Sequence, residues 1–210
     1  MTPSHEANAL FTADKRLLFL LLCLCSFLLL FVRQSFIESQ TAAFEFLQDR
    51  PEGFVLRIVQ ALQWLAIPVV YLWKLTVVAF LLWVGCFTLG YRVNYSQCWS
   101  VALGAEFVFL IPDLIKVVWF FFFVPDPRYA EIGSFYPLSL LSFFDYVEID
   151  RKWAYPLRAL NVFEFFYWLA LVSGLQLYTR KPAAIAWRIV GFFYVTIFLL
   201  WLGFYVIVYK

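Results

Sequence analysis

Long apolar stretches separated by short polar segments dominate the sequence. Helices that cross a membrane need about 20 such residues to traverse a hydrocarbon core of about 30 Å. The pattern predicts an all-α, polytopic membrane helical bundle of about five transmembrane helices plus interfacial amphipathic helices. A polar N-terminal tail is expected over residues 1–16 and a single membrane domain over 17–210. The predicted spans are about residues 17–32, 65–89, 99–124, 161–178 and 187–209.

The limits of the first two spans follow from the lengths and flanking residues of the apolar runs. The run 17–32 also suits the core of a signal peptide, but Arg33 follows at once and no small-x-small cleavage site lies near its end, so we expect a retained span. The apolar run 54–90 has 37 residues, which as a helix would reach about 55 Å, too long for one crossing. We therefore expect residues 54–64 to lie at the interface and Pro68 to kink the span that follows.

Two further segments combine aromatic and charged residues. Residues 34–50 predict an amphipathic helix at the membrane surface, and an apolar patch over 136–144 predicts a short helix within the polar 125–160 segment. Such stretches either rest on lipid head groups or dock a partner through aromatic anchors. The docking candidates are Phe44, Phe46, Phe143, Phe144 and Trp153.

Ionisable residues inside the predicted spans form an intramembrane polar cluster. Asp113 follows Glu106 by seven residues, so the two lie within about 20° on one stripe of the 99–124 helix, with Lys116 one turn further on. Charges are costly in lipid, so this stripe should face protein or a wet cavity and pair internally. Asp113 and Lys116 can neutralise each other at i,i+3. Lys74 either reaches the membrane surface or turns inward to Glu106 or Asp113.

The polar connections predict how the spans are joined. Residues 90–97 form a short turn, which makes the second and third spans an antiparallel hairpin. Asn161 and Glu164 have the spacing of a capping box, so we interpret Glu164 as a helix cap rather than a functional acid. Pro182 is placed to open the last helix.

Small residues predict where helices approach closely. Ala170 and Gly174 form a small-xxx-small pair in the fourth span, and Gly191 lies in the fifth, so we expect these two helices to pack together. The four cysteines fall in or beside apolar runs without CxxC spacing and are interpreted as buried, reduced thiols.

Composition agrees with a membrane protein and excludes several functions. The chain is 64% hydrophobic and 14% charged, whereas about a quarter of the residues in a soluble domain are charged. A net charge of +2 without a basic, aromatic-rich cluster indicates no nucleic-acid partner. The single histidine, His5, lies in the polar tail, which excludes HExxH metal sites, paired-histidine haem sites and a histidine-activated serine. We predict no enzyme activity, no cofactor and no metal.

The C-terminal half has an order of motifs typical of one family. Ser134-Phe-Tyr-Pro-Leu-Ser-Leu-Leu-Ser-Phe-Phe-Asp145 leads into Pro156-Leu-Arg-Ala-Leu-Asn-Val-Phe-Glu-Phe-Phe-Tyr-Trp168, and Gly174-Leu-Gln-Leu-Tyr-Thr-Arg-Lys-Pro-Ala-Ala-Ile-Ala186 precedes the last span. Over residues 54–210 the chain resembles the YIP (Ypt-interacting protein) family in its bacterial, uncharacterised branch. The resemblance implies a five-helix membrane domain, a cytoplasmic N-terminus and a scaffold or trafficking role, with no catalytic residues.

Two functions follow from these observations. The first, favoured by the lack of catalytic motifs, is a non-enzymatic membrane scaffold or accessory subunit that sits in membrane lipid and binds another membrane protein. The second is a small transporter or proton-linked channel that uses Glu106, Asp113 and Lys116. We expect a multi-pass protein of the bacterial cytoplasmic (inner) membrane. Its N-terminus is predicted to be cytoplasmic because short segments on that side carry Lys15, Arg16, Arg92, Arg180 and Lys181.

Overall fold

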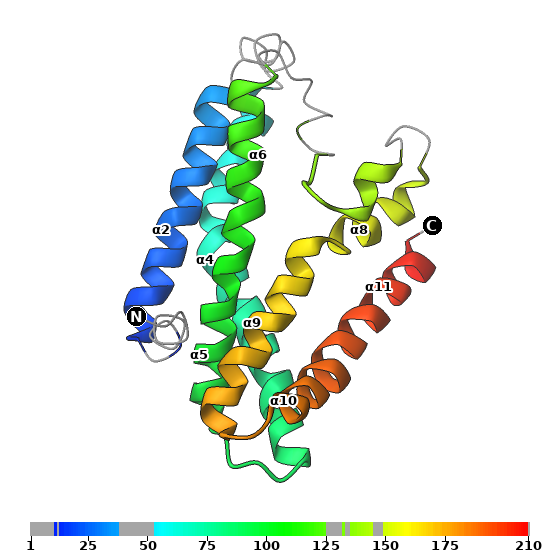
Figure 1. Cartoon of the computed structure of the whole chain (residues 1–210). Coiled ribbons are helices and arrows are strands. Elements are labelled where there is room, and N and C mark those ends of the chain that lie inside the picture. Colours follow the sequence, from blue (N-terminus) through cyan, green and yellow to red (C-terminus); the bar gives the residue numbers. More distant parts are fainter. Residues whose placement is uncertain are drawn as a thin grey trace.

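The computed structural model describes residues 11, 13–37, 53–124, 132, 135–144 and 149–209, and every regular element in this part of the chain is a helix. The elements in order are α2 (Lys15–Val32), η1 (Arg33–Ile37), α4 (Gly53–Thr88), α5 (Tyr95–Glu106), η3 (Phe107–Phe109), α6 (Leu110–Phe122), η4 (Leu140–Phe143), α8 (Arg151–Ala159), α9 (Val162–Thr179), α10 (Ala183–Ile189), η5 (Val190–Val195) and α11 (Thr196–Val208). The direction of the chain alternates from α2 to α4, to α5 with α6, to α9 and to α10 with α11, so α2 begins at one end of the bundle and α11 ends at the other (Figure 1).

Three helices in the described residues are long and apolar enough to cross a membrane. They are Lys15–Phe36, Ile58–Thr88 and Ala183–Val208, which correspond to the first, second and fifth predicted spans. By length and composition these three helices suit a membrane protein, as predicted. Helices also occupy the predicted positions 99–124 and 161–178, but they do not belong to these three.

The second span has no boundary near residue 65. Instead, α4 runs for 36 residues through Pro68 as one helix. Gln63 and Trp64, which were expected at the membrane surface, hydrogen-bond within the bundle: the Gln34 side-chain amide donates to Gln63 Oε1 and Trp64 Nε1 donates to Gln34 Oε1, both at 2.9 Å. These bonds join α4 to the helix before it.

The first helix continues beyond its predicted end. The residues from Arg33 to Ile37 extend α2 as a π-helical turn, η1, rather than starting a separate surface helix. Phe36 of η1 packs edge-on against Phe121 of α6, with ring centroids 6.1 Å apart. The rest of the predicted 34–50 helix, with the docking candidates Phe44 and Phe46, lies outside the described residues.

The predicted 99–124 helix is broken into α5 and α6. The turn between them, η3, is a 3₁₀ helix that begins directly after Glu106. Pro112 provides the physical reason: it has no N–H to donate to the carbonyl of Val108, and its ring crowds that carbonyl. A single regular helix is therefore replaced by two that meet beside Glu106.

The core of the bundle is built around α5, which packs against α4 on one side and α9 on the other. Gly85 lets η5 approach α4 closely, since a Cβ at this position would lie 2.8 Å from atoms of both Ile189 and Phe193. From this contact α4 and α11 diverge (Figure 1). All four cysteines are free thiols, and Cys23, Cys86 and Cys98 are buried, as predicted.

The small residues of α9 serve a different contact from the predicted one. A Cβ on Gly174 would lie 2.8 Å from Phe11 and 2.9 Å from Val101, whereas Gly191 has nothing within 4 Å of such an atom. Phe11 fills the space between Gly174 and Gly104, and the Tyr178 hydroxyl donates to the Phe11 carbonyl at 2.7 Å. The predicted polar tail is thus anchored in the bundle at Phe11.

The 125–160 segment contains a helix that the sequence analysis missed. The predicted short helix over 136–144 is represented by η4, a 3₁₀ turn. The unpredicted helix is α8, which carries Pro156 in its interior and packs against α11 and η4. An isolated antiparallel bridge joins Ser139 to Asn161 at the start of α9.

Candidate functional site: a charged cavity between the helices

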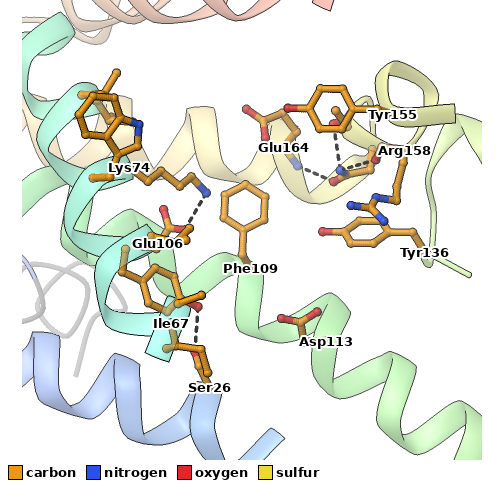
Figure 2. Close-up of a pocket in the computed structure, with 18 of the residues that line it drawn as sticks. Ser26, Ile67, Lys74, Glu106, Phe109, Asp113, Tyr136, Tyr155, Arg158 and Glu164 are labelled. Carbon is orange, nitrogen blue, oxygen red and sulfur yellow. Dashed lines mark hydrogen bonds and ion pairs between the residues drawn. The ribbon is translucent and has the colours of Figure 1, made fainter. Parts of the chain in front are cut away.

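A cavity of about 1060 Å³ lies between the α2–α4–α6 side of the bundle and the α8–α9–α11 side (Figure 2). Sites for small molecules in proteins typically measure about 300–1,000 Å³, so this volume lies slightly above the usual range. Ionisable side chains from six elements reach it, although most of the surrounding helix surface is apolar. They are Arg33, Lys74, Glu106, Asp113, Lys116, Arg158 and Glu164.

An ion pair between α4 and α5 forms the floor of the cavity. Lys74 Nζ lies 2.6 Å from Glu106 Oε1, and the Glu106 side chain is 2% exposed. The same ammonium group lies 3.9 Å from the ring centroid of Phe109 and 5.3 Å from that of Tyr167. Of the two alternatives for Lys74, the structure has the inward one. Its charge is stabilised by the carboxylate and by two aromatic faces.

Two buried polar atoms beside this pair have no hydrogen-bond partner among the described residues. They are Glu106 Oε2 and the Tyr167 hydroxyl. Leaving a buried donor or acceptor unsatisfied costs about 1–3 kcal/mol, so such atoms are rare in folded proteins. Of these two residues Glu106 lines the cavity, so its unsatisfied oxygen lies inside the bundle next to the cavity floor.

Glu164 lies across the cavity from Lys74 (Figure 2). The predicted cap is present in the backbone, because Asn161 Oδ1 accepts from the Glu164 N–H at 2.8 Å. The Glu164 carboxylate, however, turns into the bundle, where it accepts from Trp168 Nε1 at 2.9 Å and from the Tyr194 hydroxyl at 3.0 Å. Our interpretation of Glu164 as only a cap was therefore wrong: its carboxylate belongs to the cavity wall.

Asp113 is accessible from the cavity and is surrounded by positive charge. Three cationic side chains from other turns and helices, Arg33, Lys116 and Arg158, line the cavity with it. The sequence analysis considered Lys116 and Lys74 as its partners, and Arg33 and Arg158 were not anticipated. Burial, together with the nearby Asp113 carboxylate, raises the pKa of Tyr136 above its usual range, so this hydroxyl stays a neutral hydrogen-bond donor at neutral pH.

Three departures from regular α-helix geometry adjoin the cavity. The π-helical turn η1 begins at Arg33, the 3₁₀ turn η3 ends at Phe109, and the π-helical η5 carries Tyr194. The Thr196 hydroxyl donates to the Gly191 carbonyl five residues earlier, at 3.0 Å. Non-α turns inside helices are frequently found at functional sites. Here each of them places a side chain on the cavity wall.

The structure thus brings the predicted cluster together: Glu106, Asp113, Lys116 and Lys74 all line this cavity. Sequence reasoning missed the contributions of Arg33, Tyr155, Arg158 and Glu164. Arg158 and Tyr155 lie on α8, a helix that was not predicted because Pro156 lies inside it. Arg33 was assigned only as a charged residue that follows the first span. Tyr155 and Arg158 are three residues apart in an aromatic and basic segment, and this helical spacing could have predicted that they share one face of a helix.

The aromatic docking candidates lie elsewhere. The side chains of Phe143, Phe144 and Trp153 are exposed, with Phe143 81% exposed, and none of them lines the cavity. Among the described residues no group of three or more histidine, cysteine or acidic side chains could hold a metal ion. Comparisons with protein-family models, with curated proteins and with solved structures find no match to this chain.

Proposed function

We propose that the chain is a small integral membrane transporter whose ligand occupies the cavity between its helices and whose operation is linked to protons. The observation that carries the proposal is the Lys74–Glu106 ion pair on the cavity floor. Ionisable residues inside a membrane bundle are costly and mark ligand or proton pathways by default. This reverses the preference for a scaffold that the sequence alone suggested.

The chemistry follows from the pair itself. A proton taken up by Glu106 removes its negative charge and weakens its attraction for Lys74. The ammonium group is then available to an anionic ligand group in the cavity, with the faces of Phe109 and Tyr167 still beside it. Loss of the proton restores the ion pair and displaces that group. Proton binding and ligand binding are in this way coupled through one side chain.

We further propose that the chain crosses the membrane about five times, with α5–α6 and α9 as the third and fourth spans. The alternating direction of the helices supports this, as do two contacts at the end of the bundle where α2 begins. There Lys15 Nζ donates to the Ser96 carbonyl at 2.7 Å, and Tyr178 reaches Phe11. A location in the bacterial inner membrane, a cytoplasmic N-terminus and membership of the YIP family stay predictions.

Reconstituted vesicles test the transport proposal. Vesicles loaded with a pH-sensitive dye should show proton movement when a transported solute is added from a panel of small organic anions. The Glu106→Gln variant should lose this signal, because it carries no titratable group at the cavity floor. The Asp150→Asn variant is the matched control, since Asp150 pairs with Lys152 at the surface. Equal signals from both variants would contradict the role of Glu106.

A scaffold function is the second candidate, and the exposed aromatic residues of η4 and its neighbour favour it. Phe143 and Phe144 lie side by side in the chain and are both exposed. Aromatic anchors carry a disproportionate share of binding energy at protein interfaces. If the chain is a scaffold, the Phe143→Ala/Phe144→Ala variant should release a stoichiometric partner that co-purifies with the unsubstituted protein. Absence of such a partner from both preparations counts against this function.

A further inference from the structure

We propose that the ligand of this cavity is an anionic phospholipid, which enters sideways from the membrane between α4 and α11. The inference rests on the proposed function and deepens it, because it names the class of molecule that the cavity binds. Three features of the cavity support it: its apolar wall, its position relative to lipid and its distribution of charge.

One wall of the cavity is apolar and aromatic and comes from two helices. On α4 it consists of side chains at helical spacing, and on α11 of three apolar side chains that line the same cavity. These wall residues are Val70, Trp73, Val77 and Leu81 on α4 and Ile197, Phe198 and Trp201 on α11. A surface of this kind binds acyl chains through apolar contact and offers few hydrogen bonds to a water-soluble solute.

The same wall is open at the side of the bundle. Trp73 and Trp201 line the cavity, yet their side chains are 72% and 53% exposed. Both belong to helices that are long and apolar enough to cross a membrane, so exposed side chains at this depth face hydrocarbon rather than water. The close contact at Gly85 holds α4 against η5, and from there α4 and α11 diverge (Figure 1). The cavity mouth therefore faces the lipid.

The charged part of the cavity favours an anion. The described residues that line the cavity include four cationic side chains, Arg33, Lys74, Lys116 and Arg158, and three carboxylates, Glu106, Asp113 and Glu164. With all seven charged, these groups sum to +1, and protonation of Glu106 in the proposed function raises the sum to +2. The described lining thus carries a net positive charge. A phosphate group is the natural partner for arginine and lysine in such a setting.

The two parts together fit an amphiphile better than a solute. A headgroup phosphate placed among Arg33, Lys116 and Arg158 leaves its acyl chains to lie along the α4 and α11 wall and to continue through the mouth into the membrane. Tyr136 and Tyr155 also line the cavity and supply hydroxyl groups for the headgroup. Figure 2 shows Tyr136 and Arg158 next to each other on the α8 side of the cavity.

The test is native mass spectrometry of the full-length protein in mild detergent, titrated with phosphatidylglycerol or with phosphatidylcholine of the same acyl chains. We expect tighter binding of phosphatidylglycerol. Arg158→Gln should weaken the binding of phosphatidylglycerol by about tenfold, which corresponds to the loss of one charged contact. The binding of phosphatidylcholine should not change. Arg188→Gln is the matched control, because Arg188 is an exposed arginine of α10 outside the cavity. It should change neither lipid.

A second pair of variants addresses the wall without touching any charge. Val77→Phe places a ring in the cavity wall and should weaken the binding of both lipids. Val69→Phe makes the same change on the same helix at an exposed position outside the cavity and should weaken neither. This pair keeps the test decisive if Arg158→Gln does not fold.

The outcomes separate the lipid inference from the transport proposal. Equal binding of the two lipids, or equal effects of Arg158→Gln and Arg188→Gln, overturns the lipid inference. Full displacement of phosphatidylglycerol by inorganic phosphate also overturns it, because the ligand is then a water-soluble anion, while Glu106-dependent transport would survive. A co-purifying protein that excludes lipid from the cavity overturns it in favour of a partner helix. If neither lipid binding nor Glu106-dependent proton movement is observed, both the lipid inference and the transport proposal are wrong.

Discussion

Lys74 of α4 and Glu106 of α5 are 32 residues apart in the chain, yet their side chains meet at 2.6 Å. The pair joins the two helices of an antiparallel hairpin, whose turn follows α4 at Gly90. It also lies where the helix ends and η3 begins. One contact therefore joins the stability of the hairpin to the chemistry of the cavity.

Lys74→Met should lower the free energy of unfolding by about 3 kcal/mol, because it leaves the carboxylate of Glu106 buried without its cation. Replacing both residues by Met should recover most of this loss, since an apolar pair needs no charge compensation. Chemical denaturation in detergent measures both. Lys152→Met, which removes one side of an exposed pair with Asp150, should change stability by less than about 1 kcal/mol. Equal losses for the two single lysine variants would show that the buried Glu106 carboxylate does not depend on Lys74.

Two neighbouring tyrosines should respond in opposite ways to loss of the hydroxyl group. Tyr194→Phe removes a donor to Glu164 and should destabilise the protein by about 1–3 kcal/mol. Tyr167→Phe removes a buried hydroxyl without a partner in the described chain, so it should be neutral or stabilising. The two rings pack together at 5.5 Å, which makes each variant the control for the other. Thermal unfolding of the two variants measures this difference. A Tyr167→Phe variant that is less stable than Tyr194→Phe would contradict the observed hydrogen bonding.

Gly174→Ala should displace the N-terminal anchor, because the new methyl group would lie 2.8 Å from the ring of Phe11. We expect faster hydrogen exchange around residue 11 and easier removal of the N-terminal residues by protease. The Phe11→Ala/Gly174→Ala variant removes the clash with Phe11 and keeps only the 2.9 Å approach to Val101, so its loss of stability should be smaller than the sum of the two single losses. If Gly174→Ala leaves protease resistance unchanged, Phe11 does not occupy this position in the membrane.

The odd number of spans that we propose places the two chain ends on opposite sides of the membrane. A reporter that is active only outside the cytoplasm should be active when fused after Lys210 and inactive when fused before Met1. This follows from the alternating direction of the helices and from the positive charge near the predicted cytoplasmic side. Activity at both ends, or at neither, would require an even number of crossings.

The sequence predicted those parts of the fold that depend on a single local property. Apolar length located α2, α4 and the α10–α11 helix, and turn chemistry located the hairpin at Gly90, which has a positive φ of 77°. Helix breaks were harder, because they depend on the surroundings. Pro68 is tolerated inside α4, whereas Pro112 accompanies a change to 3₁₀ geometry at η3. Proline content alone does not distinguish these two cases.

The candidate site was predicted in part for a similar reason. Helical spacing placed Glu106 and Asp113 on one stripe, and the cost of burying charge implied a cavity. The partners on other elements depend on how helices cross, and this is not encoded by spacing within one helix. Arg158 reaches the site from α8, and Glu164 turns inward because Trp168 and Tyr194 donate to it. These tertiary contacts had no signal in local periodicity.

The central claim is that the cavity above the Lys74–Glu106 pair holds a ligand. The most direct measurement is untargeted mass spectrometry of the small molecules released from purified wild-type, Val77→Phe and Val69→Phe proteins. We predict at least one compound that is enriched in the wild-type and Val69→Phe preparations and depleted from Val77→Phe, where the new ring occupies the cavity wall. Identical contents in all three well-folded preparations would contradict the claim.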